Sequence, residues 1–543
     1  MDFPLTLSAI FRRAEGVFPR RPIVTRRADK SIHRQTFADF ALRTRRLAQA
    51  LRSLGVAPGD RVATLAWNSH QHLEAYFGIP LAGGVLHTLN LRLHPDEIRF
   101  IVNDADDRVV LVDESLLPLW QTIAPNTSVR HTIVMRAAGR GGTGDAASRE
   151  TASREMTDFE DLLGSAEALP DGPEPDERTA AAMCYTTGTT GKPKGVLYSH
   201  RALALHSLAV SLPGCFGIGE RDVILPVVPM FHANAWGLPY AAAMNGAALV
   251  LPGPHLDAAS LVELFDSERV TLTAGVPTIW MSVLQYLDAN PGKYDLSPLQ
   301  TMVVGGAAIP QALIEAFERR HGLKVVHAWG MTETTPLGTA SHVPPDLADA
   351  SDDTKYQRRA KQGRPAPFVE IRARNENGLV AWDGVTMGEL EVRGPWVASA
   401  YYNRDECGDR FTSDGWFKTG DVVTVDERAT VSIQDRSKDM IKSGGEWISS
   451  VALESALMGH PAVAEAAVIP VASAKWSERP LATVVLKSGA TASSEELRAF
   501  LAPLFPRFWL PDAVEFIDAI PRTSAGKFQK SALRERFRDY RVA

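Results

Sequence analysis

The chain contains 543 residues, of which 45% are hydrophobic and 22% are charged, and its formal net charge at pH 7 is −6. This length exceeds what one hydrophobic core supports, so we expect two or more domains, and the acidic balance argues against a nucleic-acid-binding protein. Three cysteines without metal-ligand spacing, no apolar leader and no apolar run of ~18 residues predict a cytoplasmic protein with no transmembrane segment.

Helix and strand patterns alternate between residues 36 and 112, which predicts a layered α/β sheet. Apolar residues recur at helical spacing from Phe37 to Leu54, and Gly55 is a typical C-cap. Residues 137–156 are rich in Gly, Ala, Ser, Thr and Arg, so we expect a mobile surface insertion there. The buried strands are predicted at 62–66, 85–89 and 108–112, with helices around 73–77 and after Pro95.

Residues 185–195 read Tyr-Thr-Thr-Gly-Thr-Thr-Gly-Lys-Pro-Lys-Gly and are the most informative stretch of the chain. Apolar residues flank this stretch on both sides, which predicts a strand, a loop and a second strand. Glycines let the backbone approach a ligand, threonine hydroxyls can bind phosphate oxygens or a metal ion, and two lysines add positive charge, so the loop suits a polyphosphate. It is not a Walker A loop, because Gly188 and Gly191 are too close together and Pro193 replaces the Ser or Thr. The alternative is a flexible surface loop.

Strand and helix patterns resume from residue 180 to residue 340 and fit two α/β lobes. The predicted strands end in glycine-rich or polar turns, which places ligands at their carboxyl ends. These strands lie at 224–228, 247–251, 272–274, 301–304 and 325–326.

The pattern changes at residue 368. Residues 368–434 contain alternating or β-branched segments between Asn-Gly and Asp-Gly turns, which predicts a small β-barrel or an antiparallel layer. A charged break at 435–439 marks a boundary, and residues 447–543 predict a small α+β domain. Its elements are strands at 466–469 and 482–486 and a helix whose capping box is formed by Ser493 and Glu496.

Two motifs supply groups that could bind a nucleotide. In Trp329-Gly330-Met331-Thr332-Glu333, the aromatic ring could stack on a purine, Thr332 could bind a phosphate oxygen and Glu333 could hold Mg²⁺; the alternative is a solvated loop carboxylate. Asp421 follows a tight glycine turn, so it could accept hydrogen bonds from a ribose diol. The alternative for Asp421 is an Asx turn.

Two further motifs lie toward the C-terminus. Residues 435–447 read Asp-Arg-Ser-Lys-Asp-Met-Ile-Lys-Ser-Gly-Gly-Glu-Trp, and the alternative to a functional role is a solvated linker. Lys527 ends the stretch from Pro521 and lies on a glycine-containing loop, from which it could swing into a site as a point charge. An ordinary surface lysine is the alternative.

These five motifs span residues 185–527 in one order, and together they resemble the adenylate-forming superfamily of acyl-CoA synthetases, luciferases and peptide-synthetase adenylation domains. The stretches at 228–237 and 443–449 are similar to the bacterial medium- and long-chain fatty-acyl-CoA synthetases. The resemblance implies a large domain of two layered α/β lobes and a small β-barrel at 1–434, a hinge at 435–440, and a small mobile α+β domain at 441–543 that carries the catalytic lysine. It also implies a homodimer.

The implied activity is that of a fatty acid–CoA ligase. A medium- or long-chain carboxylate would attack ATP to give acyl-AMP and pyrophosphate, and the acyl group would then pass to CoA. The expected partners are a fatty acid, ATP and CoA, with Mg²⁺ and without nucleic acid. Three alternatives stay open: an aryl- or thioether-acid CoA ligase, an acyl-AMP ligase that loads a carrier protein, and a non-catalytic nucleotide-binding module.

The resemblance also assigns roles residue by residue. The catalytic residues would be Lys527, Glu333 and Thr186, the last two also as Mg²⁺ ligands. The acyl site and its gate would be formed by His232, Ala233 and Trp236, and the CoA tunnel would be lined by Gly444 and Gly445. The ATP-binding residues would be Thr186, Thr187, Gly188, Thr189, Thr190, Gly191, Lys192, Lys194, Gly306, Ala307, His327, Ala328, Trp329, Gly330, Thr332, Glu333, Asp421, Arg436, Lys438, Lys442 and Trp447.

In the resembling enzymes the small domain rotates about the position of Lys438. Lys527 would therefore act in the first step and withdraw before the second. The chain departs from the family at Trp329, where many relatives have Tyr, and at Ala328, where Gly is frequent. His327 would alter the contact with the purine edge.

Overall fold

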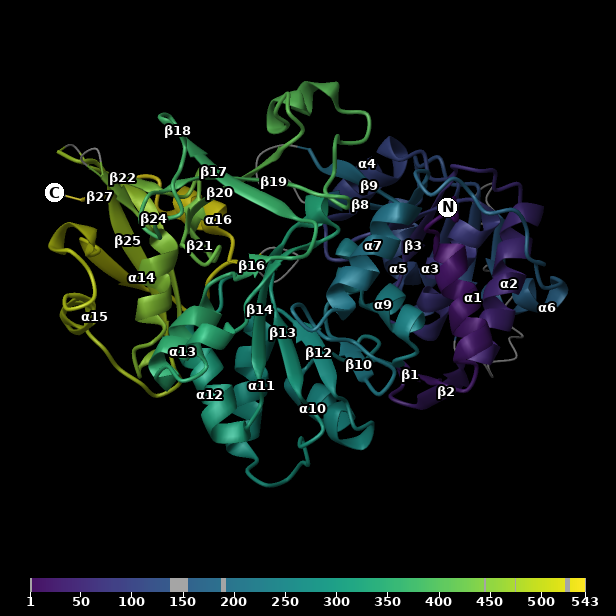
Figure 1. The fold of residues 1–543 in the computed structure, drawn as a ribbon, viewed down its shortest axis with the longest axis horizontal. Helices are drawn as coiled ribbons and strands as arrows, with labels where there is room; N and C mark the ends of the chain where they lie inside the picture. Colours follow the sequence, from purple (N-terminus) through teal and green to yellow (C-terminus); the bar gives the residue numbers. More distant parts are fainter. Residues whose placement is uncertain are drawn as a thin grey trace.

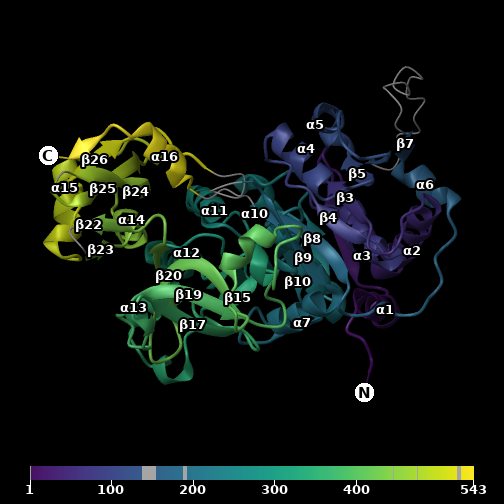
Figure 2. The same ribbon diagram turned by 90° about the horizontal axis from the view of Figure 1, so that it is seen from above.

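The computed structural model describes residues 2–136, 155–186, 192–443, 446–473, 475–522 and 528–542. Figure 1 shows the N-terminal lobe and the C-terminal segment at opposite ends of the molecule, with the strands of residues 370–436 beside the C-terminal segment. The same separation is seen from above in Figure 2. The predicted insertion at 137–156 lies outside the described residues except for its last two, which begin a strand. Among the helices described, none is long and apolar enough to cross a membrane.

Seven strands form the first sheet, in the order β7 (Glu155–Asp158), β6 (His131–Met135), β5 (Val109–Asp113), β3 (Arg61–Leu65), β4 (Val85–Thr88), β8 (Ala180–Thr186) and β9 (Lys194–Ser199). The strands from β7 to β8 are parallel, and β9 returns antiparallel to β8. The predicted strands of the first region all lie in this sheet. The strand, loop and strand predicted around residue 190 are the β8–β9 hairpin.

Nine strands form the second sheet, in the order β16 (Arg364–Pro365), β15 (Leu337–Ala340), β14 (Val325–Gly330), β13 (Thr301–Val304), β12 (Leu272–Gly275), β10 (Val223–Pro226), β11 (Ala248–Leu251), β1 (Pro22–Arg26) and β2 (Ile32–Thr36). The strands from β14 to β1 are parallel. The carboxyl ends of these parallel strands share one edge, where a ligand site is expected in such a sheet.

One continuous hydrophobic core contains residues of both large sheets and of seven helices. In β5, Val109 and Leu111 belong to this core, whereas Val110 and Val112 pack with helices on the opposite face, as a two-residue period requires. The seven helices are α1 (Leu7–Val17), α2 (Phe37–Ser53), α3 (His70–Ala82), α6 (Phe159–Ser165), α7 (His200–Ser211), α8 (Ala233–Trp236) and α9 (Leu238–Asn245). The others before residue 365 are α4 (Pro95–Asp104), α5 (Leu117–Ile123), α10 (Ala258–Ser267), α11 (Pro277–Ala289), α12 (Gln311–His321) and α13 (Asp352–Ala360). Short 3₁₀ helices lie in connections: η1 (Glu114–Leu116), η3 (Thr332–Thr334), η4 (Pro345–Leu347), η5 (Asp405–Arg410) and η6 (Arg507–Trp509).

The third sheet is an open antiparallel layer, which is one of the two predictions for residues 368–434, and the other prediction, a small β-barrel, is wrong. Its order is β18 (Gly378–Leu379), β17 (Glu370–Asn375), β19 (Gly388–Arg393), β20 (Phe417–Val425) and β21 (Val431–Arg436), and its outer strands do not pair with each other. A barrel requires that the first and last strands complete the ladder. Here β18 has only two residues, and Val431 of β21 instead bridges to Gly363.

Six strands form the fourth sheet, in the C-terminal segment. The order is β23 (Glu446–Ile448), β22 (Ile441–Ser443), β25 (Ser477–Leu486), β24 (Val463–Ser473) and β27 (Arg541–Val542), with β26 (Ala513–Phe516) also paired to β25. Helices α14 (Ser450–Leu457) and α15 (Ser494–Leu501) form one core with this sheet, and α16 (Lys530–Arg536) contributes to a second. The capping box of Ser493 and Glu496 is confirmed.

Candidate active site

The β8–β9 hairpin presents the polar loop predicted for a polyphosphate. Thr186 is the last residue of β8, half-buried and paired in register with Lys194. The Nζ atom of Lys192 lies 5.3 Å from the ring centroid of Phe100, and that of Lys194 lies 5.0 Å from the ring centroid of Tyr401. An aromatic face attracts a cation without neutralising it, so both charges stay available for an anion. Thr187, Gly188, Thr189, Thr190 and Gly191 lie outside the described residues.

Glu333 lies in η3, and hydroxyl groups and a backbone amide from elsewhere in the chain fix its position. The Glu333 side chain accepts a hydrogen bond at Oε1 from the Tyr401 hydroxyl (2.6 Å), and its carbonyl oxygen accepts one from the Ala398 amide (2.7 Å). The Tyr198 hydroxyl of β9 donates to the carbonyl oxygen of Thr332 (2.7 Å). These bonds join the η3 turn to the phosphate hairpin.

The donor set around Glu333 fits Mg²⁺ delivered with a nucleotide. Glu333 is a carboxylate only 5% exposed, and Thr186 supplies a hydroxyl, so both are hard oxygen donors. Within the described ranges, no group of three or more His, Cys, Asp or Glu side chains could hold a metal ion. Mg²⁺ is commonly bound by one or two protein oxygens together with phosphates and water, which matches this arrangement.

Trp329 and Asp421, predicted to contact a purine and a ribose, touch each other although 92 positions separate them. The Trp329 Nε1–H donates to Asp421 Oδ2 (3.0 Å), and Arg436 Nε forms an ion pair with Asp421 Oδ1 (2.8 Å). Asp421 is 2% exposed, and it is the register partner of Arg436 across β20 and β21. Both oxygens of Asp421 thus have a donor within reach, and a carboxylate is also a strong acceptor for hydroxyl groups.

The segment expected to face the purine lies where β13 and β14 end. Gly306 follows β13 with a φ of 81°, and Ala307 is exposed. His327 is buried, its Nδ1 lies 3.0 Å from the carbonyl oxygen of Ala360, and burial lowers its pKa to about 4. The imidazole is therefore neutral at pH 7 and donates to α13. Ala328 is buried beside it, and Gly330 ends the strand.

The predicted acyl gate stands on a left-handed turn. The φ angles of Ala233, Asn234, Ala235 and Trp236 are 42°, 51°, 49° and 56°, and Gly237 continues at 73°. Left-handed backbone costs about 1–2 kcal/mol per non-glycine residue and rarely extends beyond a single one, so the surroundings must hold this run in place. Buried Asn234 supplies such a tether, because its Oδ1 accepts a hydrogen bond from the Cys184 thiol of β8 (2.8 Å).

The turn places the Trp236 ring against the end of β13. A Cβ atom on Gly305 would lie 3.0 Å from the Trp236 ring, so only glycine permits this approach. Trp236 itself is half-buried, as is His232, which precedes the turn, whereas Ala233 is buried. At the other end of the turn, a Cβ on Gly237 would meet the buried ring of His206 at 2.6 Å.

The C-terminal candidates are exposed. Lys442 and Trp447 are register partners on β22 and β23, and the Lys442 Nζ lies 4.6 Å from the Trp447 ring centroid. Lys438, between the third and fourth sheets, is also exposed. Gly444, Gly445 and Lys527 lie outside the described residues.

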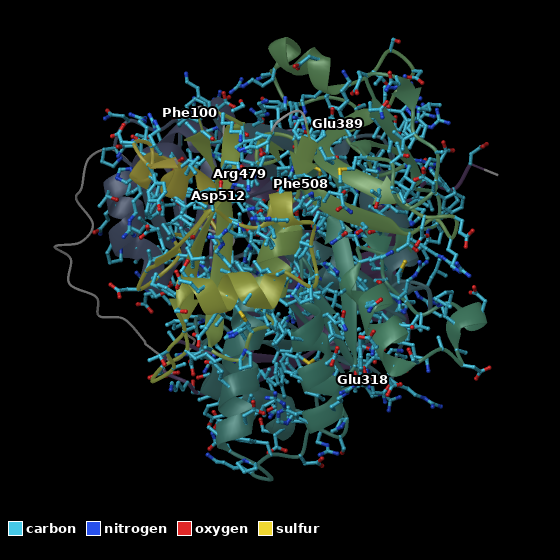
Figure 3. All side chains as sticks on the ribbon, turned by 90° about the vertical axis from the view of Figure 1, so that its left-hand side faces the viewer. Phe100, Glu318, Glu389, Arg479, Phe508 and Asp512 are labelled. Atoms are coloured by element: carbon cyan, nitrogen blue, oxygen red, sulfur yellow. The ribbon has the colours of Figure 1, made fainter. Side chains whose placement is uncertain are left out.

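Buried ionic groups flank these exposed residues. Figure 3 shows Arg479 close to Phe508 and Asp512; its guanidinium pairs with Asp512 (2.6 Å) and donates to the Phe508 carbonyl (2.6 Å) and to Ser443 Oγ (2.9 Å). Ser443 directly precedes Gly444. The guanidinium thus fixes the start of the glycine turn to the rest of the fourth sheet.

A second buried group connects the end of the third sheet to α14. Asp435 of β21 accepts hydrogen bonds from the amide (2.9 Å) and the hydroxyl of Ser450, and burial raises its pKa. Lys530 forms an ion pair with Glu454 (2.7 Å), whose pKa burial raises to about 7. The contact between Asp435 and Ser450 thus ties the first residue of the predicted hinge to the C-terminal segment.

Sequence reasoning missed Tyr401, Tyr198 and Asn234. The two tyrosines act through hydroxyls whose partners lie 68 and 134 positions away, so no local pattern could reveal them. Asn234 lies inside a stretch singled out by resemblance, and an Asn between two alanines is the one local sign of left-handed backbone.

Comparison with known proteins adds independent findings. The model of the AMP-binding enzyme family matches residues 11–402, and that of the AMP-binding enzyme C-terminal domain matches residues 452–527. The chain is 49% identical to a long-chain-fatty-acid–CoA ligase of Thermus thermophilus, over 99% of this chain and 97% of the relative. It is 43% identical to a 3-methylmercaptopropionyl-CoA ligase of Ruegeria pomeroyi (99% and 98% covered) and 42% identical to a medium-chain-fatty-acid–CoA ligase of Ectopseudomonas oleovorans (98% and 96%).

Solved structures share the whole fold. The anthranilate CoA ligase AuaEII in complex with anthranoyl-AMP has a TM-score of 0.86 at 25% identity, over 99% of this chain and 98% of that one. ATP-bound MatB from Rhodopseudomonas palustris has a TM-score of 0.82 at 26% identity, over 99% of both chains. The large N-terminal part and the smaller C-terminal part are both covered by these matches.

Proposed function

The chain belongs to the AMP-binding enzyme family, and on that premise we propose that it is an AMP-forming fatty acid–CoA ligase acting on a medium- or long-chain acid. The observation that carries this proposal is full-length identity of 42–49% to long- and medium-chain fatty-acid CoA ligases. The contact of Trp329, Asp421 and Arg436 supports it, because these three candidates from distant motifs meet at one place.

In the first step a carboxylate oxygen attacks the α-phosphorus of ATP, and the bond to the pyrophosphate oxygen breaks. Negative charge grows on the phosphoryl oxygens, so the enzyme acts through positioning and positive charge. Lys192 and Lys194 would hold the β- and γ-phosphates with Thr186–Gly191, Thr332 would bond the α-phosphate, and Lys527 would bridge it to the carboxylate. Thr186 and Glu333 would hold Mg²⁺, which offsets phosphate charge when bound.

The nucleoside would lie against the third sheet. Asp421 would accept hydrogen bonds from the ribose hydroxyls, with Arg436 beside it. Trp329 and Gly306 would flank the adenine, and the backbone of Ala307 and of His327 to Gly330 would line its edge. Because Asp421 is already held by Trp329 and Arg436, it needs little rearrangement when the ribose arrives.

In the second step the CoA thiolate attacks the acyl carbon and AMP leaves. We propose a hinge at 435–440 that includes Lys438, between a domain at 1–434 and a domain at 441–543. Rotation would withdraw Lys527 and bring Gly444 and Gly445 to the pantetheine path. Lys442 and Trp447 would approach the adenylate from the hinge side.

The acid would enter past His232, Ala233 and Trp236. A thioether acid is the second candidate substrate, because a 3-methylmercaptopropionyl-CoA ligase is 43% identical over nearly the whole chain. A homodimer, which rests on the resemblance, and a cytoplasmic location, which rests on the cysteine usage, are further proposals. Light scattering on the purified chain tests the former, and fractionation of the source cells tests the latter.

Pyrophosphate release with a panel of short, medium, long, aromatic and thioether acids, with and without CoA, tests the function. Turnover that needs both a fatty acid and CoA is the expected result. A preference for the thioether acid would favour the second candidate, and release without CoA-dependent turnover would indicate a carrier protein as acceptor. If no acid supports release, the ligase proposal fails.

A further inference from the structure

The segment 398–404 contacts three separate parts of the candidate polyphosphate site. The Ala398 amide and the Tyr401 hydroxyl hold the carbonyl and the carboxylate of Glu333 (2.7 and 2.6 Å). The Tyr402 amide donates to the carbonyl oxygen of Gly195 (2.9 Å), at the end of the phosphate loop. The Tyr401 ring also lies against the Lys194 ammonium. One short segment therefore sets the distance between Glu333 and the far end of the loop.

Asp104, the last residue of α4, anchors this segment and the near end of the loop together. Its Oδ1 pairs with Arg404 (2.5 Å), and its Oδ2 accepts a hydrogen bond from the Tyr185 hydroxyl (2.7 Å). Tyr185 directly precedes Thr186. The Asp104 and Arg404 side chains are only 14% and 15% exposed, so water and salt screen this pair less than a surface pair.

Both ends of a glycine-rich loop are thus tied to the same support. The described residues that border the loop therefore have set positions relative to each other and to Glu333. Tyr185 fixes one end through Asp104, and Gly195 fixes the other through Tyr402. Glu333 is held by the same segment, 398–404. Neither Asp104 nor Tyr401 belongs to the five motifs.

We propose that Tyr401 and Asp104 are positioning residues for the β- and γ-phosphates of ATP. The proposal rests on the proposed function and deepens it. Each residue acts through another group: Tyr401 through Glu333, and Asp104 through Tyr185 and Arg404. We call the contacts of Tyr401 and Asp104 the brace. Because AMP lacks these two phosphates, the brace should affect ATP binding and acyl-AMP formation, but not AMP binding or the step that consumes acyl-AMP.

The positioning role is tested with the variants Tyr401→Phe and Asp104→Asn. Their affinities for ATP and for AMP are measured by calorimetry at one saturating Mg²⁺ concentration. We expect the Kd for ATP to rise about tenfold, as for loss of one hydrogen bond to a charged group, with the Kd for AMP within about twofold. Thioester formation from supplied acyl-AMP and CoA, run with a metal chelator, should be unchanged. An equal loss for ATP and AMP, or no loss for either, would overturn the proposal.

Tyr294→Phe and Asp295→Asn are matched controls. They make the same substitutions at a hydroxyl contact with Tyr286 and at a more exposed ion pair with Arg269, both outside the candidate site. Neither should change the difference between ATP and AMP binding. If Asp104→Asn fails to fold, Tyr401→Phe, which deletes one hydroxyl, still decides the question.

The outcomes separate this proposal from the proposed function. If the variants selectively lose ATP affinity but the protein activates no acid, the positioning role stands and the ligase proposal is rejected. An active ligase whose Tyr401→Phe and Asp104→Asn variants bind ATP normally would keep the ligase and reject the brace.

Discussion

The first 436 residues and the C-terminal segment hold their candidate residues in different ways. Asp421 and Glu333 are 2% and 5% exposed and are bonded to side chains from distant parts of the chain, whereas Trp447 is 40% exposed. Buried, partnered groups are in place before a ligand arrives, and exposed ones can exchange partners at little cost. The difference is compatible with the proposed hinge, in which a fixed half would bind the nucleotide and a movable half would alternate between the two steps.

The largest expected effect comes from the movable half. Lys527→Ala should reduce acyl-AMP formation by about 10²–10³-fold, because in the proposed mechanism its positive charge stabilises the developing oxyanion. Thioester formation from supplied acyl-AMP should be spared. Pyrophosphate exchange and acyl-CoA production, measured separately, check this, and Lys487→Ala in the same domain is the control. Equal loss of both half-reactions would refute the two-position account.

A change in the fixed half should instead affect both half-reactions. Asp421→Asn keeps the shape but removes the charge that pairs with Arg436 and would bind the ribose. We expect ATP and AMP affinity to fall alike, by roughly 10–100-fold, because hydrogen bonds to a buried charge are lost. Binding of both nucleotides by calorimetry checks this. A loss confined to ATP would show that Asp421 does not contact the ribose.

Acid should weaken the fixed half. Burial lowers the pKa of His327 to about 4, against 6.5 in the unfolded chain, so between these values only the unfolded state binds the proton. The contribution of His327 to the free energy of unfolding is therefore complete above pH 6.5 and is lost as pH falls. The loss amounts to about 2 kcal/mol between pH 7 and pH 5. His327→Gln should reduce the acid shift of the melting temperature, and His321→Gln, on the partly exposed end of α12, should not.

The contacts around the hinge should respond in the opposite sense. Burial raises the pKa of Glu454 to about 7, so between its unfolded value of 4.5 and pH 7 the folded state keeps a proton that the unfolded state has lost. That contribution is favourable at low pH and declines as pH rises toward 7. Glu454→Gln should therefore make stability fall less as pH rises. Melting temperatures measured from pH 5 to pH 7.5 check this.

A smaller effect is expected where the two halves meet. Rotation about Lys438 would have to separate Asp435 from Ser450. Ser450→Ala removes the hydroxyl contact, worth about 1 kcal/mol, and should change the ratio of the two half-reaction rates by about fivefold while ATP binding stays constant. Ser455→Ala on the same helix is the control. An unchanged ratio would mean that this contact persists in both positions.

The smallest effect concerns the acyl gate. Trp236→Ala should make the affinity for a fatty acid independent of ATP, a change of a few-fold, because it removes the ring that we propose as the gate of the acyl path. Titration of a fluorescent fatty acid with and without an ATP analogue checks this. If ATP dependence persists as in wild type, Trp236 is a packing residue on its left-handed turn.

Residue types and their order were sufficient to predict the α/β lobes, the β8–β9 hairpin, the capping box at Ser493 and the family. Periodicity and turn chemistry act over short distances, so they can be read along the chain. They could not show that the third sheet stays open, because closure depends on how its edge strands pair. They also could not show the left-handed run from Ala233, whose residues, Asn234 apart, have no preference for it.

The sequence by itself determined which chemical groups the site contains, because each motif carries its own threonine, lysine, glutamate or aspartate. Only the tertiary structure decided how these groups are held. Trp329 donates a hydrogen bond to Asp421, Tyr401 donates one to Glu333, and Tyr185 donates one to Asp104. The reason is physical, since a hydrogen bond between residues far apart in the chain exists only after both sheets have packed. Until then nothing local distinguishes a positioning tyrosine from any other.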